Sequence, residues 1–119
     1  MKKMSEFKEL LTLLEKFRDE RDWRQFHDSK NLALALSIEA AELNELFLWK
    51  NESESEKVDR QRLREELADV FAYALMLAGR HGLDVSEIVK EKIEKNGRKY
   101  PIEKCKGSSR KYKDINSQN

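Results

Sequence analysis

Residues that interrupt helices are scarce in this chain, which contains four glycines and one proline among its 119 residues. The rest is rich in Leu, Ala, Glu, Lys and Arg, whose intrinsic propensities favour the helix. A chain of this length is typical of one small domain with a single core. We therefore predict an all-α fold in one domain, residues 1–119, in which residues 98–119 form an irregular C-terminal tail.

Apolar residues recur at three- and four-residue spacing in four segments, and this period indicates amphipathic helices. The predicted helices span residues 5–20, 29–50, 59–81 and 85–95, and a polar loop at residues 51–57 separates the second from the third. Capping signals support these limits. Ser5 is a predicted N-cap, Gly82 a left-handed C-terminal residue and Asp84 the start of a capping box, while Asn96-Gly97 is expected to end the fourth helix.

The second predicted helix carries apolar residues on two sides. One stripe runs from Leu32 to Leu46, and Leu34, Ala41 and Leu48 lie roughly opposite it at 100° per residue. Such a helix should be buried all round, yet a small domain rarely surrounds one of its own helices. We therefore expect a second subunit to cover the other side, which predicts a homo-oligomer, either a dimer or a tetramer.

Four carboxylates, Glu39, Glu42, Glu66 and Asp69, interrupt the apolar stripes of the second and third predicted helices. A carboxylate on a buried face is costly unless a cation or hydrogen-bond donors meet it. Side chains three residues apart are neighbours on a helix, so antiparallel packing would bring both pairs together. No His or Cys shares these stripes, and an oxygen-only ligand set favours Mg²⁺ or Mn²⁺ over zinc. Ion pairs with Arg or Lys are an equally good interpretation of the spacing alone.

Charge, cysteine content and hydropathy narrow the possible classes of function. Because 24 Lys and Arg oppose 23 Asp and Glu, the formal net charge is only +1, and we expect no nucleic-acid partner. The single cysteine, Cys105, cannot form an intrachain disulfide and fits a reducing compartment. No apolar run has the length of a signal peptide core or a membrane span. We expect a cytoplasmic protein with no membrane partner.

The acidic pattern resembles the split signature of the MazG-like nucleotide pyrophosphohydrolases, an ExxE followed, after a helix-loop-helix interval, by an ExxD. Glu39-Ala-Ala-Glu42 and Glu66-Leu-Ala-Asp69 match it. Residues 17–112 resemble, more narrowly, the dCTP pyrophosphatase branch of this family. The segments that carry this likeness are Arg21-Asp-Trp-Arg-Gln-Phe-His27, Leu46-Phe-Leu-Trp-Lys50, Glu65-Glu-Leu-Ala-Asp-Val70, Lys92-Ile-Glu-Lys-Asn96 and Arg98-Lys-Tyr-Pro101.

The resemblance implies a four-helix bundle completed by oligomerisation and an enzyme that requires Mg²⁺, with Mn²⁺ as a substitute. Its reaction would hydrolyse a nucleoside triphosphate, dCTP or a modified dCTP, to the monophosphate and pyrophosphate. Glu39, Glu42, Glu66 and Asp69 would hold the cation. One of these four, or a neighbouring carboxylate, would orient the attacking water.

Three aromatic residues, Trp23, His27 and Trp49, resemble positions that form the pyrimidine pocket of this branch. Aromatic faces stack on any base, so selectivity also needs hydrogen bonds to the ring edge, and His27 could supply one. Considered without the resemblance, the two tryptophans would be structural residues and His27 a solvated loop residue.

Polar residues near the C-terminus resemble the family's phosphate- and sugar-contacting group. Lys92, Asn96 and Tyr100 recur every four residues, so at least the first two share a helix face. Without the resemblance they would be ordinary exposed residues. Arg110 and Lys111 belong to a segment similar to one that packs along a neighbouring subunit, which would bring them toward the next active site.

Other classes of protein remain open at this point. An all-α dUTPase-type enzyme would share the acidic residues but prefer another base. A non-catalytic helical oligomer would pair its acidic stripe with basic residues across the subunit interface. A di-iron bundle is disfavoured, because neither His27 nor His81 follows a stripe glutamate by three residues.

Overall fold

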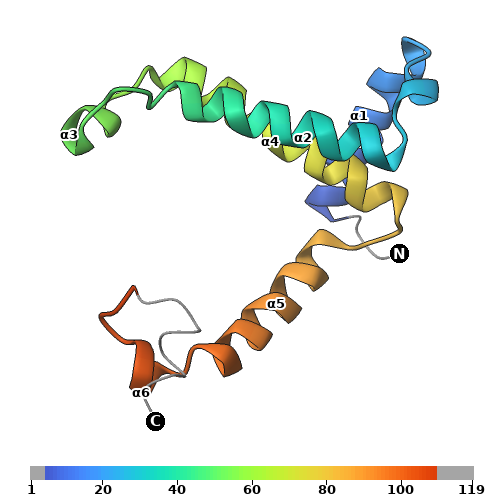
Figure 1. Ribbon diagram of the computed structural model, residues 1–119. Coiled ribbons are helices and arrows are strands. Elements are labelled where there is room, and N and C mark those ends of the chain that lie inside the picture. The colour runs from blue at the N-terminus through green and yellow to red at the C-terminus, as the bar shows by residue number, and fades with distance from the viewer. Residues whose placement is uncertain (1–4, 110–119) are drawn as a thin grey trace. The chain divides into compact units, whose positions relative to one another are not determined.

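The computed structural model describes residues 5–109, and every regular element within that range is helical, as predicted (Figure 1). The longer helices are α1 (Glu6–Glu20), α2 (Ser29–Glu45), α4 (Arg60–Arg80) and α5 (Val85–Lys99). Shorter ones are the 3₁₀ turn η1 (Arg24–Phe26), α3 (Glu52–Ser55) and α6 (Ile102–Cys105). The chain divides into two compact units at Leu83 and Asp84, which are described separately below.

In the N-terminal unit, α2 and α4 lie side by side in opposite directions, and α1 packs against α4 (Figure 1). Leu32, Leu46, Leu75, Met76 and Ala78 form the buried core. The two long helices therefore meet along the stripes that carry the acidic residues, which is the antiparallel pairing expected from the sequence. None of the helices in residues 5–109 is long and apolar enough to cross a membrane.

Side-chain caps fix where these helices begin. Ser5, Asp28, Asp59 and Asp84 each accept a hydrogen bond from a backbone N–H of the first turn that follows, at 2.7–3.2 Å. Such caps satisfy donors that the helix itself leaves unpaired. The N-cap predicted at Ser5 is confirmed, and of the capping box predicted at Asp84 the structure shows the bond from the Glu87 N–H to the Asp84 side chain.

The end of α4 also matches its prediction. Gly82 adopts a left-handed φ of 63°, and the N–H of Leu83 donates to the carbonyl of Ala78 at 2.9 Å. This is a Schellman motif, in which glycine is favoured because it has no Cβ to clash.

Two predictions around residues 46–57 are wrong. The second helix ends at Glu45 rather than Lys50, and the chain continues in turns to Trp49, whose φ is 62°. The polar loop contains the helix α3, because Asn51 and Glu54 form a reciprocal capping box. A short helix can form from purely polar residues when both of its end donors are satisfied in this way.

The C-terminal unit corrects the limits of the fourth helix and of the tail. Helix α5 continues through Gly97 to Lys99, and the Tyr100 N–H donates to the Asn96 carbonyl at 2.7 Å. Pro101 ends it, because proline disfavours a helical conformation in the preceding residue. The expected irregular tail instead begins with α6, while Arg110 and Lys111 lie outside the described residues.

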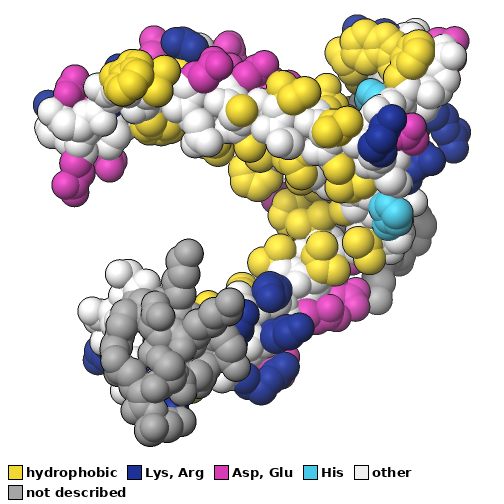
Figure 2. All heavy atoms as spheres, viewed as in Figure 1, with side chains coloured by type: hydrophobic (Ala, Val, Ile, Leu, Met, Phe, Trp, Pro, Cys, Tyr) yellow, Lys and Arg dark blue, Asp and Glu magenta, His cyan; other side chains and the backbone are white. Residues whose placement is uncertain are grey.

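The second side of α2 remains uncovered by the described residues of the N-terminal unit, 5–83. Leu34 and Ile38 are 54% and 57% exposed, and Leu32 is the only fully buried residue of the helix. Figure 2 shows hydrophobic side chains at the surface along the α2–α4 pair. Burial of α2 on all sides is therefore not achieved within residues 5–83. The predictions of a single domain and of a four-helix bundle completed by oligomerisation stay predictions.

Candidate functional site: an acidic cluster beside an aromatic cavity

Three of the four predicted carboxylates converge between α2 and α4. One oxygen from each of Glu39, Glu42 and Glu66 lies within 4.8 Å of the others. Glu39 and Glu42 are neighbours because they are three residues apart on α2, and Glu66 reaches them from α4. Glu65, the residue before Glu66 on α4, instead accepts a hydrogen bond from Gln61 at 3.0 Å. Glu65 therefore lies outside the cluster, as expected from the rotation of about 100° between successive residues of a helix.

The cluster lacks the partners that buried carboxylates normally have. Oε2 of Glu39 and Oε2 of Glu66 are both buried without a hydrogen-bond partner. No ion pair found within residues 5–109 joins Glu39, Glu42 or Glu66 to a lysine or arginine. Unpaired buried oxygens of this kind carry a desolvation cost that a bound cation would offset.

The pKa values of the cluster reflect burial and mutual repulsion. Burial raises the pKa of Glu39 to about 7, aided by a hydrogen bond with Glu42 and by the charges of Glu42, Asp69 and Glu66. The pKa of Glu66 is also raised, first by burial and then by Glu42 and Asp69, while the positive charge of Arg62 opposes the rise. Removing the excess negative charge requires either protons or a cation.

The donor set fits a hard divalent cation. All three converging groups offer carboxylate oxygens, and no histidine or cysteine joins them in the described part of the chain. Carboxylate oxygens suit Mg²⁺ and Mn²⁺, and the unpartnered oxygens of Glu39 and Glu66 are free to bind one. The cluster can therefore serve as a metal centre.

Asp69, the fourth predicted ligand, lies next to the cluster rather than within it. Its charge contributes to the raised pKa values of Glu39 and Glu66. Its side chain lines a cavity of about 130 Å³ together with Trp23, His27 and other residues of α1 and α4. Asp69 thus joins the acidic cluster to the predicted base-binding residues.

Aromatic rings form much of this cavity. Trp23 packs edge-on against Phe17, with ring centroids 5.9 Å apart, and His27 packs edge-on against Tyr73 at 6.4 Å. Burial, followed by the charge of Arg18, lowers the pKa of His27, and its buried Nδ1 has no hydrogen-bond partner. A neutral His27 can present this nitrogen to a polar ligand.

Tyr73 is a site residue that the sequence analysis did not single out. It lines the cavity together with Asp69, and its pKa is raised by burial and then by the charges of Glu39, Asp69 and Glu42. The spacing contained a signal, because Tyr73 follows Asp69 by four residues and therefore shares its helix face.

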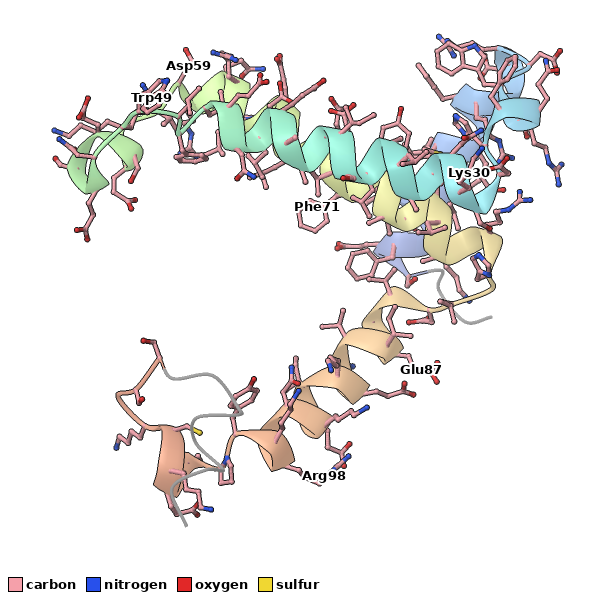
Figure 3. The ribbon with its side chains drawn as sticks, viewed as in Figure 1. Lys30, Trp49, Asp59, Phe71, Glu87 and Arg98 are labelled. Atoms are coloured by element: carbon pink, nitrogen blue, oxygen red, sulfur yellow. The ribbon has the colours of Figure 1, made fainter. Side chains whose placement is uncertain are left out.

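Trp49 does not reach this cavity within one chain. Its side chain is 91% exposed. Figure 3 shows Trp49 near Asp59, at the opposite end of α2 from Lys30. The 17 residues of α2 span about 25 Å. Because Trp23 and His27 precede α2, the predicted trio of Trp23, His27 and Trp49 does not assemble in a single copy.

The remaining predicted contacts belong to the C-terminal unit. Lys92 and Asn96 lie one turn apart on α5, and Tyr100 is its C-cap. Arg98, labelled in Figure 3, pairs with Glu94 at 3.3 Å. The Lys99 ammonium lies 5.9 Å from the centre of the Tyr100 ring. The structure thus places Lys92 and Asn96 on a common helix face, as the spacing predicts.

An all-α unit with an acidic, oxygen-only cluster between two antiparallel helices defines a class of helical proteins suited to divalent cations. Residues 34–115 match the model of the MazG-like family. The chain belongs to the MazG-like family.

Named relatives agree with this assignment. The dCTP pyrophosphatase 1 proteins of Rattus norvegicus and Homo sapiens are 42% and 43% identical to this chain over 104 residues, or 83% of its length. That alignment covers 61% of each relative, so the chain spans about three fifths of their length. The crystal structure of a pyrophosphatase from Archaeoglobus fulgidus DSM 4304 superposes with a TM-score of 0.79 at 42% identity, covering 85% of this chain and 97% of that one.

Proposed function

We propose that this protein hydrolyses dCTP, or a modified dCTP, to the nucleoside monophosphate and pyrophosphate with the help of Mg²⁺. The names of the similar proteins supply the substrate class, since they are dCTP pyrophosphatase 1 and a pyrophosphatase. The observation that carries the proposal is the convergence of Glu39, Glu42 and Glu66, with two buried oxygens that have no partner.

Glu39, Glu42 and Glu66 would hold Mg²⁺, with Mn²⁺ as a substitute, and Asp69 would complete the set from the adjacent cavity wall. Bound there, the cation would neutralise charge on the triphosphate. In the reaction, a water oxygen bonds to the α-phosphorus as the bond from that phosphorus to the bridging oxygen of pyrophosphate breaks. One of the four carboxylates, or a neighbouring one, would orient this water and take its proton.

Trp23, His27 and Tyr73 would receive the pyrimidine in the cavity beside Asp69. Trp23 offers a stacking surface, and the unpartnered Nδ1 of His27 offers a polar contact to the ring edge. Lys92, Asn96 and Tyr100 are proposed as phosphate or sugar contacts, on the resemblance of their spacing to the family pattern.

The proposal includes a homo-oligomer, a dimer or tetramer. Its support is the exposed apolar side of α2, where Leu34 and Ile38 are each more than half exposed, together with the equally exposed Leu48 in the turns that follow the helix. Trp49 lies too far from Trp23 and His27 to join them within one copy. A second copy could bring its own Trp49 to the pocket, which would explain the exposure of so large an aromatic side chain.

The direct test is to incubate the protein with each deoxynucleoside triphosphate and Mg²⁺ and to identify the products. We expect dCMP and pyrophosphate from dCTP, with dCTP ranked above dUTP, and no turnover after removal of the cation by EDTA. Glu39→Gln should be inactive but as helical as the parent by circular dichroism. Glu65→Gln is the matched control, because Glu65 lies outside the cluster and should be dispensable.

Release of dCDP and orthophosphate instead would contradict the proposed position of cleavage. A higher rate with dUTP would favour the dUTPase-type alternative. Full activity of Glu39→Gln would refute the proposed metal ligands.

A further inference from the structure

A second and larger cavity of the N-terminal unit has a basic lining. Its volume is about 490 Å³, and its polar walls come from α1, η1, the start of α2 and the end of α4. The basic and imidazole side chains that line it are Arg18, Arg24, His27, Arg80 and His81. Figure 2 shows histidine and basic side chains together where α1 and the start of α2 lie.

Acidic side chains compensate these charges only in part. Among the lining residues that the structure describes, Glu15 is the one carboxylate, 3.7 Å from Arg18. Arg18 also pairs with Asp19 at 2.8 Å, and this hydrogen bond is the main cause of the lowered pKa of Asp19, with a smaller effect from the charge of Arg24. Neither Arg24 nor Arg80 forms an ion pair with any carboxylate in residues 5–109.

Neutral groups hold Arg80 in place at the wall of the cavity. Its Nε donates to the Ser29 hydroxyl and its Nη1 to the His27 carbonyl, both at 3.2 Å. The same Ser29 hydroxyl lies 2.9 Å from Nε2 of His81. Arg80 is therefore held in one orientation by neutral groups, and no carboxylate neutralises its positive charge. Because its side chain is already ordered, a ligand that binds it would lose less conformational entropy.

We propose that this cavity binds a phosphate-class oxyanion, held by Arg24 and Arg80. A guanidinium presents paired N–H donors that match phosphate oxygens in both charge and geometry. The volume admits a phosphate or pyrophosphate ion, and also the phosphate end of a nucleotide. The acidic cluster takes no part, since none of its three carboxylates lines this cavity.

Binding is measured by isothermal titration calorimetry on the full chain in EDTA, which separates this site from any cation at the acidic cluster. The probes are inorganic phosphate, pyrophosphate, dCMP and cytidine. We expect inorganic phosphate and pyrophosphate to bind, and cytidine serves as the control for binding at the proposed base pocket of Trp23, His27 and Tyr73. An affinity for dCMP that exceeds that for cytidine and falls in the arginine variants would identify a nucleotide as the ligand, and a fall for phosphate alone would identify a free anion.

Arg24→Gln and Arg80→Gln should each weaken phosphate or dCMP binding by about tenfold or more, the loss expected for a charge-assisted contact. Arg24 donates no hydrogen bond found in residues 5–109, so its substitution tests the site without disturbing the loop that Arg80 braces. Lys16→Gln is the control with an equal change in net charge, because Lys16 lies on α1 but is not among the residues that line the cavity.

Wild-type affinity in both Arg24→Gln and Arg80→Gln would overturn the inference, and so would the absence of binding by every phosphate-bearing probe. Unchanged folding by circular dichroism is required of each variant. These outcomes do not depend on the proposed hydrolysis, because no cation and no turnover are involved. Absence of phosphate binding at this cavity would therefore not contradict the proposed hydrolysis. Absence of hydrolysis would likewise not contradict phosphate binding at this cavity.

Discussion

Replacing Glu39 by glutamine should make the metal-free protein more stable at neutral and alkaline pH while abolishing its proposed activity. Folding disfavours the ionised form of Glu39, because burial and the neighbouring carboxylates raise its pKa from 4.5 to about 7. Below pH 4.5 the carboxyl is protonated in both the folded and unfolded states, so the shift has no effect there. As pH rises from 4.5 to 7 the unfolded state loses its proton first, and the folded state loses stability across that window.

The magnitude follows from the size of the rise. A pKa change from 4.5 to about 7 corresponds to at most roughly 3 kcal/mol at pH 8. Solvent screens part of this repulsion because the Glu39 side chain is only half-buried, so we expect about 1 kcal/mol. For a domain of this size, that energy raises the unfolding temperature by roughly 3–6 °C. Glutamine keeps the shape of the side chain without the charge.

The assay is thermal unfolding followed by circular dichroism from pH 4.5 to 8.5 in EDTA. The difference in unfolding temperature between Glu39→Gln and wild type should be near zero at pH 4.5 and should reach its largest value above pH 7. Adding Mg²⁺ at pH 8 should then stabilise wild type by mass action and leave the variant unchanged. Glu65→Gln should follow wild type throughout. Wild-type stability that increases from pH 4.5 to 7 relative to the variant would refute the electrostatic reasoning.

The remaining predictions concern the core and the cavity. Leu75→Ala, at a position only 6% exposed, should lower the free energy of unfolding by about 3 kcal/mol, whereas Leu13→Ala, 64% exposed, should change it by less than about 0.5 kcal/mol. Denaturant titration measures both, and equal losses would contradict the described core. Trp23→Ala should reduce kcat/KM for dCTP by about tenfold or more through lost stacking, and an unchanged value in steady-state assays would remove Trp23 from the base pocket.

Local sequence information was sufficient for the type and approximate position of most helices. Caps such as Ser5 and the left-handed Gly82 act within one or two turns, so their effect can be predicted without knowing the fold. The predicted helix end at Gly97 and the predicted loop that begins at Asn51 were wrong, because two local signals competed at each position. Glycine permits a helix end but does not require one, and Pro101 is the stronger signal at this terminus.

The sequence by itself determined that the fold is helical and that Glu39 has Glu42, and Glu66 has Asp69, as a neighbour on the same helix, because helical spacing is a property of the chain alone. The tertiary structure decided which atoms meet. Antiparallel packing of α2 and α4 brought the carboxylates of Glu39, Glu42 and Glu66 together and placed Tyr73 of α4 beside Glu39 and Glu42 of α2. It also gathered Arg24 and Arg80, 56 residues apart in sequence, around one cavity. Such juxtapositions depend on how separate helices pack, and no local periodicity contains them.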